Sequence, residues 1–253
     1  MKSINYEKLV VVGDIHGCAD ELNDLVNQCD TNSTFLFLGD LVDRGPKSRE
    51  VVETVSRIVK DGSGFAVKGN HDESHVRYGR HLKRQMANSK YQIPMQFSEY
   101  KKRVYESLSE ENVRFLDNLP YVLGFEFNNS SWVGVHAGLE PGKTLEEQDR
   151  GKMTHIRFVN KETKKTVSML EGFRAPEGSV YWTSLHSSSV SVIYGHMVHS
   201  LSAPLVERQG LATLVGLDTG CCFGGVLSAA VFDKKATEIS WIQVPARKKY
   251  YRF

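Results

Sequence analysis

Five short apolar runs, each followed directly by a loop rich in Gly, Asp, Asn and His, constrain the fold of this 253-residue chain more than any other feature. The runs and their loops read VVVGDIHG, FLFLGDLVDRG, FAVKGNHD, WVGVHAG and VIYGH. In open α/β sheets the loops at the carboxyl ends of strands converge on one crevice, so side chains far apart in sequence can meet there. Any one of these loops could be an ordinary turn. Five together favour a shared site.

The spacing of apolar residues predicts an α/β chain. Runs of β-type composition recur at residues 9–12, 34–38, 65–67, 132–135, 190–194, 213–217, 225–232 and 238–244. Between the first three runs, apolar residues recur at helical spacing over 22–29 and 51–59. Strand, helix, strand, helix, strand indicates a parallel sheet with right-handed crossovers.

Residues 73–119 interrupt this rhythm with a long, polar, helix-favouring segment, which we interpret as a helical insertion. Between Glu73 and Arg103 it carries eight Lys or Arg and two acids. Because the whole chain has a net charge of only +2, attraction to anions depends on such local clusters, although a solvated helix face would look the same. Residues 161–165 favour a hairpin or loop, and the basic tail ARKKYYRF is expected to be a solvated terminus.

Four cysteines show no regular spacing, which favours a reducing compartment over a disulfide framework. The apolar N-terminal run is too short for a signal peptide, and no stretch approaches the roughly 20 apolar residues of a membrane span. We therefore expect a cytoplasmic protein without membrane contact, and nothing in the sequence indicates an obligate protein partner.

The side chains in the five loops favour a metal centre. Asp14 and His16 are two apart in extended chain, so both can face the crevice while Ile15 points into the core. Asp40 could bridge two ions. The predicted ligands are Asp14, His16, Asp40, Asn70, His136 and His196. Oxygen and nitrogen donors without thiolate suit Mn²⁺, with Fe²⁺, Co²⁺ or Zn²⁺ as alternatives.

Nine histidines are present, so placement must separate functional from structural ones. Four of them follow a strand at once or within two residues: His16, His71, His136 and His196. The other five lack that placement and are interpreted as structural: His75, His81, His155, His186 and His199.

The ordered set GDIHG, GDLVDRG, GNHD, HAG and GH resembles the phosphoprotein-phosphatase superfamily of dinuclear metallophosphatases. The resemblance implies a metallophosphatase fold, a β-sandwich flanked by helices, formed by residues 1–253 as one calcineurin-like domain with a helical cap at 73–119. Strands after residue 190 would supply much of the second sheet. Two ions about 3.5–4 Å apart would generate a hydroxide that attacks phosphorus.

Three further residues are predicted to act in catalysis. Arg44, four residues after Asp40, could offer a planar fork of donors to phosphoryl oxygens, although a structural ion pair is the alternative. By resemblance His71 is the general acid that protonates the departing oxygen. Asp43 would pair with His71 and fix its orientation.

Two shorter signatures bear on the substrate. GLDTGCCFGG (216–225) and MTHIRFVN (153–160) resemble sequences of symmetrical diadenosine tetraphosphatases and their ApaH-like relatives. Arg157 matches a phosphate-contacting arginine of that group, and Phe223 could stack on a base. The alternative for residues 216–225 is a hairpin without a binding role, and the alternative for Arg157 is an ordinary surface arginine. The resemblance implies that a dinucleoside polyphosphate, diadenosine tetraphosphate, is cleaved symmetrically into two ADP.

One residue differs from the pattern of symmetrical tetraphosphatases, so other substrates remain alternatives. Bacterial symmetrical tetraphosphatases usually have Ala where this chain has Asp43, whereas protein phosphatases have Asp. A Ser/Thr or Tyr protein phosphatase is therefore the runner-up. RNA with a cap or a 5′-polyphosphate would also fit the basic insert and tail. A non-catalytic nucleotide- or RNA-binding module is a fourth hypothesis, which turnover of an aryl phosphate would exclude.

Overall fold

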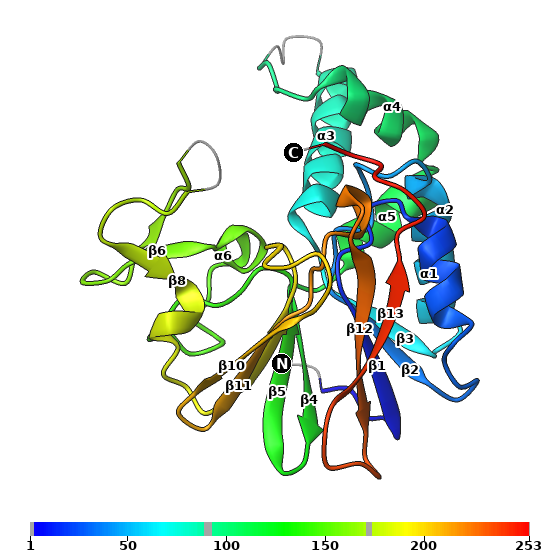
Figure 1. The fold of residues 1–253 in the computed structure, drawn as a ribbon. Helices are drawn as coiled ribbons and strands as arrows, with labels where there is room; N and C mark the ends of the chain where they lie inside the picture. Colours follow the sequence, from blue (N-terminus) through cyan, green and yellow to red (C-terminus); the bar gives the residue numbers. More distant parts are fainter. Residues whose placement is uncertain (1–2, 89–92, 171–173, 253) are drawn as a thin grey trace.

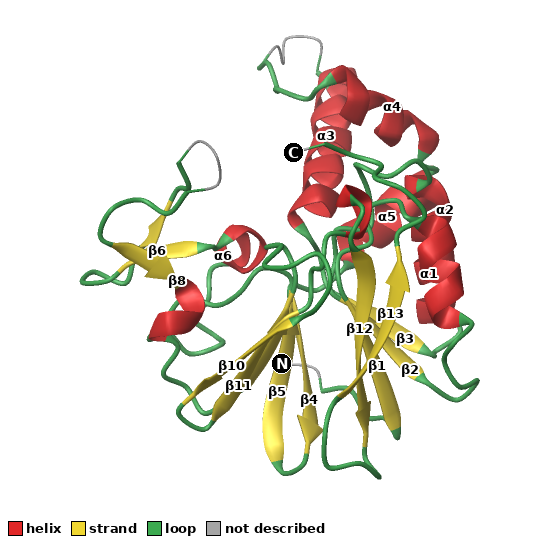
Figure 2. Ribbon diagram, viewed as in Figure 1, coloured by secondary structure: helices red, strands yellow, loops and turns green. Residues whose placement is uncertain are grey.

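The computed structural model describes residues 3–88, 93–170 and 174–252. Two five-stranded sheets pack face to face, and helices cover the outer face of the first (Figures 1 and 2). The first sheet has the order β13-β12-β1-β2-β3 and the second β10-β11-β9-β5-β4. Their strands are β1 (Lys8–Val12), β2 (Thr34–Phe37), β3 (Gly64–Ala66), β12 (Val226–Asp233) and β13 (Ser240–Pro245), and β4 (Val122–Phe127), β5 (Ser130–Val135), β9 (Ser191–Tyr194), β10 (Leu205–Gln209) and β11 (Ala212–Gly216).

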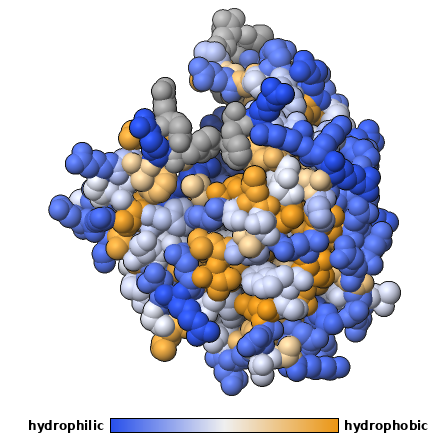
Figure 3. All heavy atoms as spheres, viewed as in Figure 1, coloured by the Kyte–Doolittle hydropathy of each residue, from blue (hydrophilic) through white to orange (hydrophobic). Residues whose placement is uncertain are grey.

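The predicted parallel unit is confirmed. β1 pairs parallel with β2, and β2 with β3, joined by α1 (Ala19–Val26) and α2 (Ser48–Lys60). Along β1, Val10 and Val12 belong to the core under the helices, whereas Leu9 and Val11 belong to the core between the sheets. Because β1 is buried on both faces, it reads as a continuous apolar run in the sequence. The outer surface of this helical layer is hydrophilic (Figure 3).

The helical insertion is also confirmed. It comprises α3 (Asn70–Ala87), α4 (Glu99–Ser107) and α5 (Glu110–Asn118), which lie together above one end of the first sheet (Figure 1). α3 starts at Asn70, so it carries the predicted site residues Asn70 and His71 in its first turn. Lys90 of the basic cluster lies outside the described residues. That the chain forms one domain stays a prediction.

Strands after residue 190 supply three of the five strands of the second sheet, as expected, but they also contribute to the first. β9, β10 and β11 join the second sheet, but β12 and β13 return to the first, where β12 pairs antiparallel with β1. Their apolar side chains complete that sheet beside β1, because Ala229 and Val231 lie in the core under the helices. The sequence pattern identifies these runs as strands without indicating their sheet.

A small third sheet, β7-β6-β8, was not predicted as a unit. It is built from β6 (Phe158–Asn160), β7 (Thr166–Val167) and β8 (Ser179–Tyr181). β6 and β7 form the expected hairpin around 161–165. This small sheet and α6 (Arg150–His155) lie at the same end of the sandwich as α3, but on the other side of it (Figure 1).

The expectation of a solvated C-terminal tail is wrong for the residues described. Arg247 forms ion pairs with Asp20 at 3.2 Å and Asp24 at 2.9 Å on α1, and the Tyr250 hydroxyl donates to Glu21 at 2.8 Å. These contacts hold the tail across α1 because its basic and aromatic side chains meet acids in the first two turns of that helix. Among the residues described, no helix is long and apolar enough to cross a membrane.

Candidate active site

The predicted metal ligands meet at one edge of the sandwich. β1, β2 and β3 run parallel in the first sheet, as do β5 and β9 in the second, and the loops that follow these five strands deliver the side chains. Asp14 and His16 follow β1, Asp40 follows β2, Asn70 follows β3, His136 follows β5 and His196 follows β9. This is the convergence expected at the carboxyl ends of strands.

The loops reach this point through an unusual backbone conformation. Five non-glycine residues of the site have positive φ: 47° at His16, 48° at Asp40, 71° at Asp43, 67° at Arg44 and 68° at His196. A left-handed conformation costs an L-residue roughly 1–2 kcal/mol. Such strain persists where the surrounding structure enforces it, and it clusters at functional sites.

Two glycines are required by close approach to the carboxylates. A Cβ on Gly69 would lie 2.2 Å from Asp40 Oδ1, and a Cβ on Gly195 would lie 2.0 Å from Asp14 Oδ1. Neither position can carry a side chain without displacing a predicted ligand. Gly69 and Gly195 are therefore required for the position of the carboxylates as well as for the turns.

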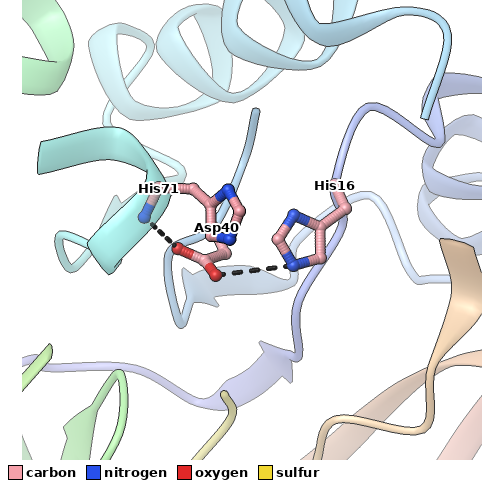
Figure 4. Close-up of side chains that lie close together, drawn as sticks. All are labelled: His16, Asp40 and His71. Carbon is pink, nitrogen blue, oxygen red and sulfur yellow. Dashed lines mark hydrogen bonds and ion pairs between the residues drawn. The ribbon is translucent and has the colours of Figure 1, made fainter. Parts of the chain in front are cut away.

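Two imidazoles are oriented toward the same carboxylate oxygen. His16 Nδ1 lies 2.9 Å from Val42 O and His136 Nδ1 lies 2.8 Å from Leu38 O, so each Nδ1–H donates to a backbone carbonyl. Each Nε2 is then directed inward, and each lies 3.4 Å from Asp40 Oδ2 (Figure 4 shows His16). Asp40 is thus placed between two nitrogen donors, as a bridging ligand would be.

Further donors gather around His136. Its Nε2 lies 2.9 Å from Asn70 Oδ1 and 3.2 Å from His196 Nδ1. Burial by itself would lower the pKa of His136, but Asp40 and Asp14 outweigh it and raise that pKa to about 9. The carboxylates therefore attract positive charge to this position, where a divalent cation could replace the proton.

Asp14 is placed to accept a cation. Its Oδ1 accepts the His196 N–H at 3.0 Å, and its buried Oδ2 has no hydrogen-bond partner among the described residues. Burial and the nearby Asp218 raise the pKa of Asp14 well above its usual range. Asp218 was not predicted to belong to the site. Its Oδ2 also has no partner among the described residues, and burial raises its pKa to about 6. Divalent ions would satisfy this excess of buried acceptors, so the residues fit a metal centre.

His71 and Asp43 form the predicted pair. His71 Nδ1 lies 2.6 Å from Asp43 Oδ2, while the backbone N–H of His71 donates to Asp40 Oδ1 at 2.8 Å (Figure 4). Burial favours the neutral form of Asp43, but hydrogen bonds from His71 and His75 outweigh it and hold its pKa below the usual range. Asp43 is therefore a carboxylate that fixes the ring of His71.

His75 was interpreted as structural, and it is held in place beside the predicted catalytic pair. It is fully buried, and its Nε2 lies 2.7 Å from Asp43 Oδ1. Lys101 of α4 places Nζ 3.4 Å from Asp43 Oδ2. We call Asp43, His71, His75 and Lys101 the Asp43 network. The i, i+4 spacing of His71 and His75 on a helix was the signal available in the sequence.

Arg44 lies beside the first ligand set. Its Nη1 donates to His16 Nε2 at 2.6 Å, and its guanidinium lies 5.0 Å from the centre of the Phe223 ring. Phe223 is only 7% exposed and also contacts Tyr251, with ring centres 6.2 Å apart. Phe223 thus supports Arg44 in this structure, and stacking on a base stays a prediction.

Arg157 lies on the other side of the centre. It follows α6 and lines a cavity of about 470 Å³ together with Lys152 and His155. The His155 ring centre is 6.4 Å from that of His196. Burial lowers the pKa of Arg157 against the opposing influence of Tyr181 and Asp40. His155 was interpreted as structural because no strand precedes it, yet it stands between the cavity and a predicted ligand.

Comparison with known proteins gives the site a context. The model of the calcineurin-like phosphoesterase family matches residues 7–215. The chain is 28% identical over 257 residues to bis(5′-nucleosyl)-tetraphosphatase PrpE [asymmetrical] of Halalkalibacterium halodurans, with 94% of each chain covered. It is 27% identical over 256 residues to the protein of that name from Bacillus subtilis, with 95% of each covered.

Solved structures of related proteins have the same fold as this chain. A crystal structure of a protein described as a candidate diadenosine tetraphosphatase superposes with a TM-score of 0.71 at 25% identity, covering 96% of each chain. A protein serine/threonine phosphatase from Saccharomyces cerevisiae shares the fold, with a TM-score of 0.55 at 15% identity over 95% of this chain and 80% of that one. The predicted metallophosphatase fold and hydrolase class are confirmed, and members of this class use a dinuclear divalent metal centre. The chain belongs to the calcineurin-like phosphoesterase family.

Proposed function

We propose that this hydrolase cleaves dinucleoside tetraphosphates and that its six predicted ligands hold two divalent ions. One observation carries the metal assignment: two imidazoles, each oriented by a backbone carbonyl, direct Nε2 to the same oxygen of Asp40. The buried Oδ2 of Asp14, which has no hydrogen-bond partner in the part of the chain that the structure describes, supports it. Donors of oxygen and nitrogen favour Mn²⁺, with Fe²⁺, Co²⁺ or Zn²⁺ as alternatives. Bound there, the ions would acidify water and neutralise charge on the phosphoryl oxygens.

The chain's own residues would bind the phosphate and deliver a proton. Arg44 would turn its guanidinium from His16 toward a phosphoryl oxygen, because its fork suits two oxygens of one phosphate. His71, held by Asp43 at 2.6 Å, would protonate the departing oxygen. Arg157 would meet charge on the neighbouring phosphates.

The regiochemistry is proposed from the relatives. From the sequence we expected symmetric cleavage to two ADP, but two relatives that align with 94–95% of this chain are named asymmetrical. We therefore propose that diadenosine tetraphosphate yields ATP and AMP. The water oxygen would bond to the phosphorus next to one adenosine. The bond from that phosphorus to the bridging oxygen would break, and the departing ATP would take its proton from His71.

Product analysis tests this proposal. The protein with Mn²⁺ is incubated separately with diadenosine tetraphosphate, capped RNA, 5′-triphosphate RNA and a phosphopeptide, and products are separated by chromatography. We expect turnover of the dinucleotide with ATP and AMP in equal amounts. Two ADP would contradict the asymmetric assignment. Turnover of the phosphopeptide or of either RNA without turnover of the dinucleotide would overturn the substrate class.

A further inference from the structure

The cavity beside α6 is built from two segments that the metal site does not use. One segment carries Lys152, His155 and Arg157, at and just after the end of α6, and the other is β7 with the two residues that follow it. The lining includes Asp149, Gly151, Thr166, Val167, Ser168 and Met169. Its volume of about 470 Å³ lies within the range of roughly 300–1,000 Å³ typical of small-molecule sites. We call this space the α6 cavity.

Two polar atoms of residues that line the α6 cavity are buried and unsatisfied. Arg157 Nε and Thr166 Oγ1 have no hydrogen-bond partner among the described residues. A buried donor or hydroxyl without a partner costs roughly 1–3 kcal/mol, so such atoms call for an explanation. They belong to two segments that line one cavity, and a ligand with polar groups there would satisfy them.

The walls differ in chemistry, and the difference points to a class of ligand. Lys152 and Arg157 supply positive charge near the metal centre, whereas Val167 and Met169 supply apolar surface beside the Thr166 hydroxyl. Inorganic phosphate would use the charge and leave the apolar wall and most of the volume unfilled. A nucleoside carrying a 5′-phosphate has one anionic end and one flat, largely apolar end with polar edges.

One residue of the cavity lining also lies close to a predicted metal ligand. His155 lines it, and the ring centre of His155 is 6.4 Å from that of His196. His155 Nδ1 lies 3.1 Å from Gly151 O, which fixes the ring against α6. A ligand with one phosphate at the metal centre can therefore extend past His155 into the cavity.

We propose that the α6 cavity binds one nucleoside 5′-phosphate end of the substrate, with Lys152 meeting phosphate charge and Thr166 hydrogen-bonding the nucleoside. The inference rests on the proposed function and adds to it: selectivity for dinucleotides over simple phosphate esters resides in α6 and β7. Lys152 and Thr166 are then specificity-determining residues, and neither was predicted from the sequence.

Thr166→Val and Lys152→Ala test this assignment against Lys161→Ala, an exposed lysine of the same hairpin that does not line the cavity. The readout is the ratio of kcat/KM for diadenosine tetraphosphate to kcat/KM for p-nitrophenyl phosphate, with Mn²⁺. We expect the ratio to fall about threefold to tenfold in Thr166→Val, which corresponds to the loss of one hydrogen bond. In Lys152→Ala we expect it to fall about tenfold. Lys161→Ala should keep the wild-type ratio.

Thermal unfolding separates binding from folding. Because Thr166 Oγ1 is buried and has no hydrogen-bond partner among the described residues, replacing it with an isosteric methyl should not lower Tm. A reduced ratio at undiminished Tm would support the proposal. An unchanged ratio in both variants would overturn it while leaving the proposed function intact. A wild-type protein that turns over the aryl phosphate but not the dinucleotide would instead overturn the proposed function.

Inhibition identifies the ligand's chemistry. AMP and inorganic phosphate are compared as inhibitors of p-nitrophenyl phosphate hydrolysis. We expect AMP to inhibit the wild type at least about tenfold more tightly than phosphate, and the Thr166→Val and Lys152→Ala variants to lose most of that difference. Equal inhibition by AMP and phosphate in the wild type would mean that no nucleoside is bound, contradicting the assignment.

Discussion

The two sides of the candidate metal centre are built in different ways. On the α3 side, both oxygens of Asp43 have partners within the protein, and His75 is fully buried behind it. On the α6 side, Arg157 and Thr166 line a cavity, and each carries a buried polar atom that has no partner among the described residues. Asp43, which orients His71, is thus fully partnered in the free protein, although His75 Nδ1 is buried without a partner among the described residues. On the α6 side, a ligand would supply the missing partners.

This contrast separates two tasks. A proton donor works best when its orientation is fixed before the substrate arrives, so its partners belong to the protein. Selectivity among phosphate esters requires groups that are satisfied by the correct ligand and left unpaired by others. Changes on the α3 side should therefore lower kcat for every substrate. Changes on the α6 side should alter the preference between substrates.

The largest effect is expected at the centre that both sides share. Asp14→Asn keeps an oxygen that can accept the His196 N–H but removes the carboxylate charge. We expect metal content to fall by about one ion per chain and kcat to fall about 10⁴-fold for all substrates. Metal assistance is worth several kcal/mol, and each ~1.4 kcal/mol is a factor of ten. Metal analysis and kcat for both substrates check this, with Asp30→Asn on the exposed surface as control.

His71→Asn tests the proton donor on the α3 side. We expect kcat to fall roughly 10²- to 10⁴-fold while both ions remain bound, because the ring would act as acid and not as a metal ligand. The loss should be smaller for p-nitrophenyl phosphate, whose departing oxygen needs less protonation. An enzyme of undiminished rate on diadenosine tetraphosphate would remove His71 from the mechanism.

His75 measures how much the Asp43 network contributes through orientation alone. His75→Leu removes the donor to Asp43 Oδ1, and by analogy with groups that orient metal ligands we expect kcat to fall roughly 10- to 100-fold at similar KM. His75→Gln can still donate and should recover much of the loss. If His75→Leu and His75→Gln were equally impaired, packing against Phe97 and not the hydrogen bond would explain the effect.

The smallest effect concerns pH and stability. Burial raises the pKa of Asp218 to about 6, above its ordinary value, so between about pH 4 and pH 6 the native state holds a proton that the unfolded state has lost. Stability of the metal-free protein should therefore fall as pH rises through this window, by roughly 1–3 kcal/mol from this group. Asp218→Asn removes the contribution. Urea unfolding at pH 5 and pH 7.5 with a chelator should show a smaller pH difference in the variant, and an identical difference would refute the assignment.

Residues that follow a strand directly could be predicted from the sequence. Asp14, Asp40 and His136 each occur at the end of an apolar run, and parallel pairing brings the ends of those runs together. The position of each side chain is set by a few neighbouring residues and by topology. Here local pattern was sufficient to predict where they meet.

The remaining features depend on tertiary contacts that leave little local signal. Lys101 reaches Asp43 from a separate helix, and Tyr250 reaches Glu21 across 229 positions of the chain. The α6 cavity depends on a two-residue strand, β7, too short for its periodicity to be recognised. The orientation of His16 and His136 depends on backbone carbonyls that no side-chain motif specifies.

The most direct test of the account is a metal titration of the wild-type protein. Ions are removed with a chelator, Mn²⁺ is added back stepwise, and bound metal and hydrolysis of diadenosine tetraphosphate are measured on the same samples. The convergence of His16 and His136 on Asp40 predicts that turnover disappears on chelation and returns in full as two ions bind per chain. Full turnover in the metal-free protein, or with one ion per chain, would contradict a two-metal centre.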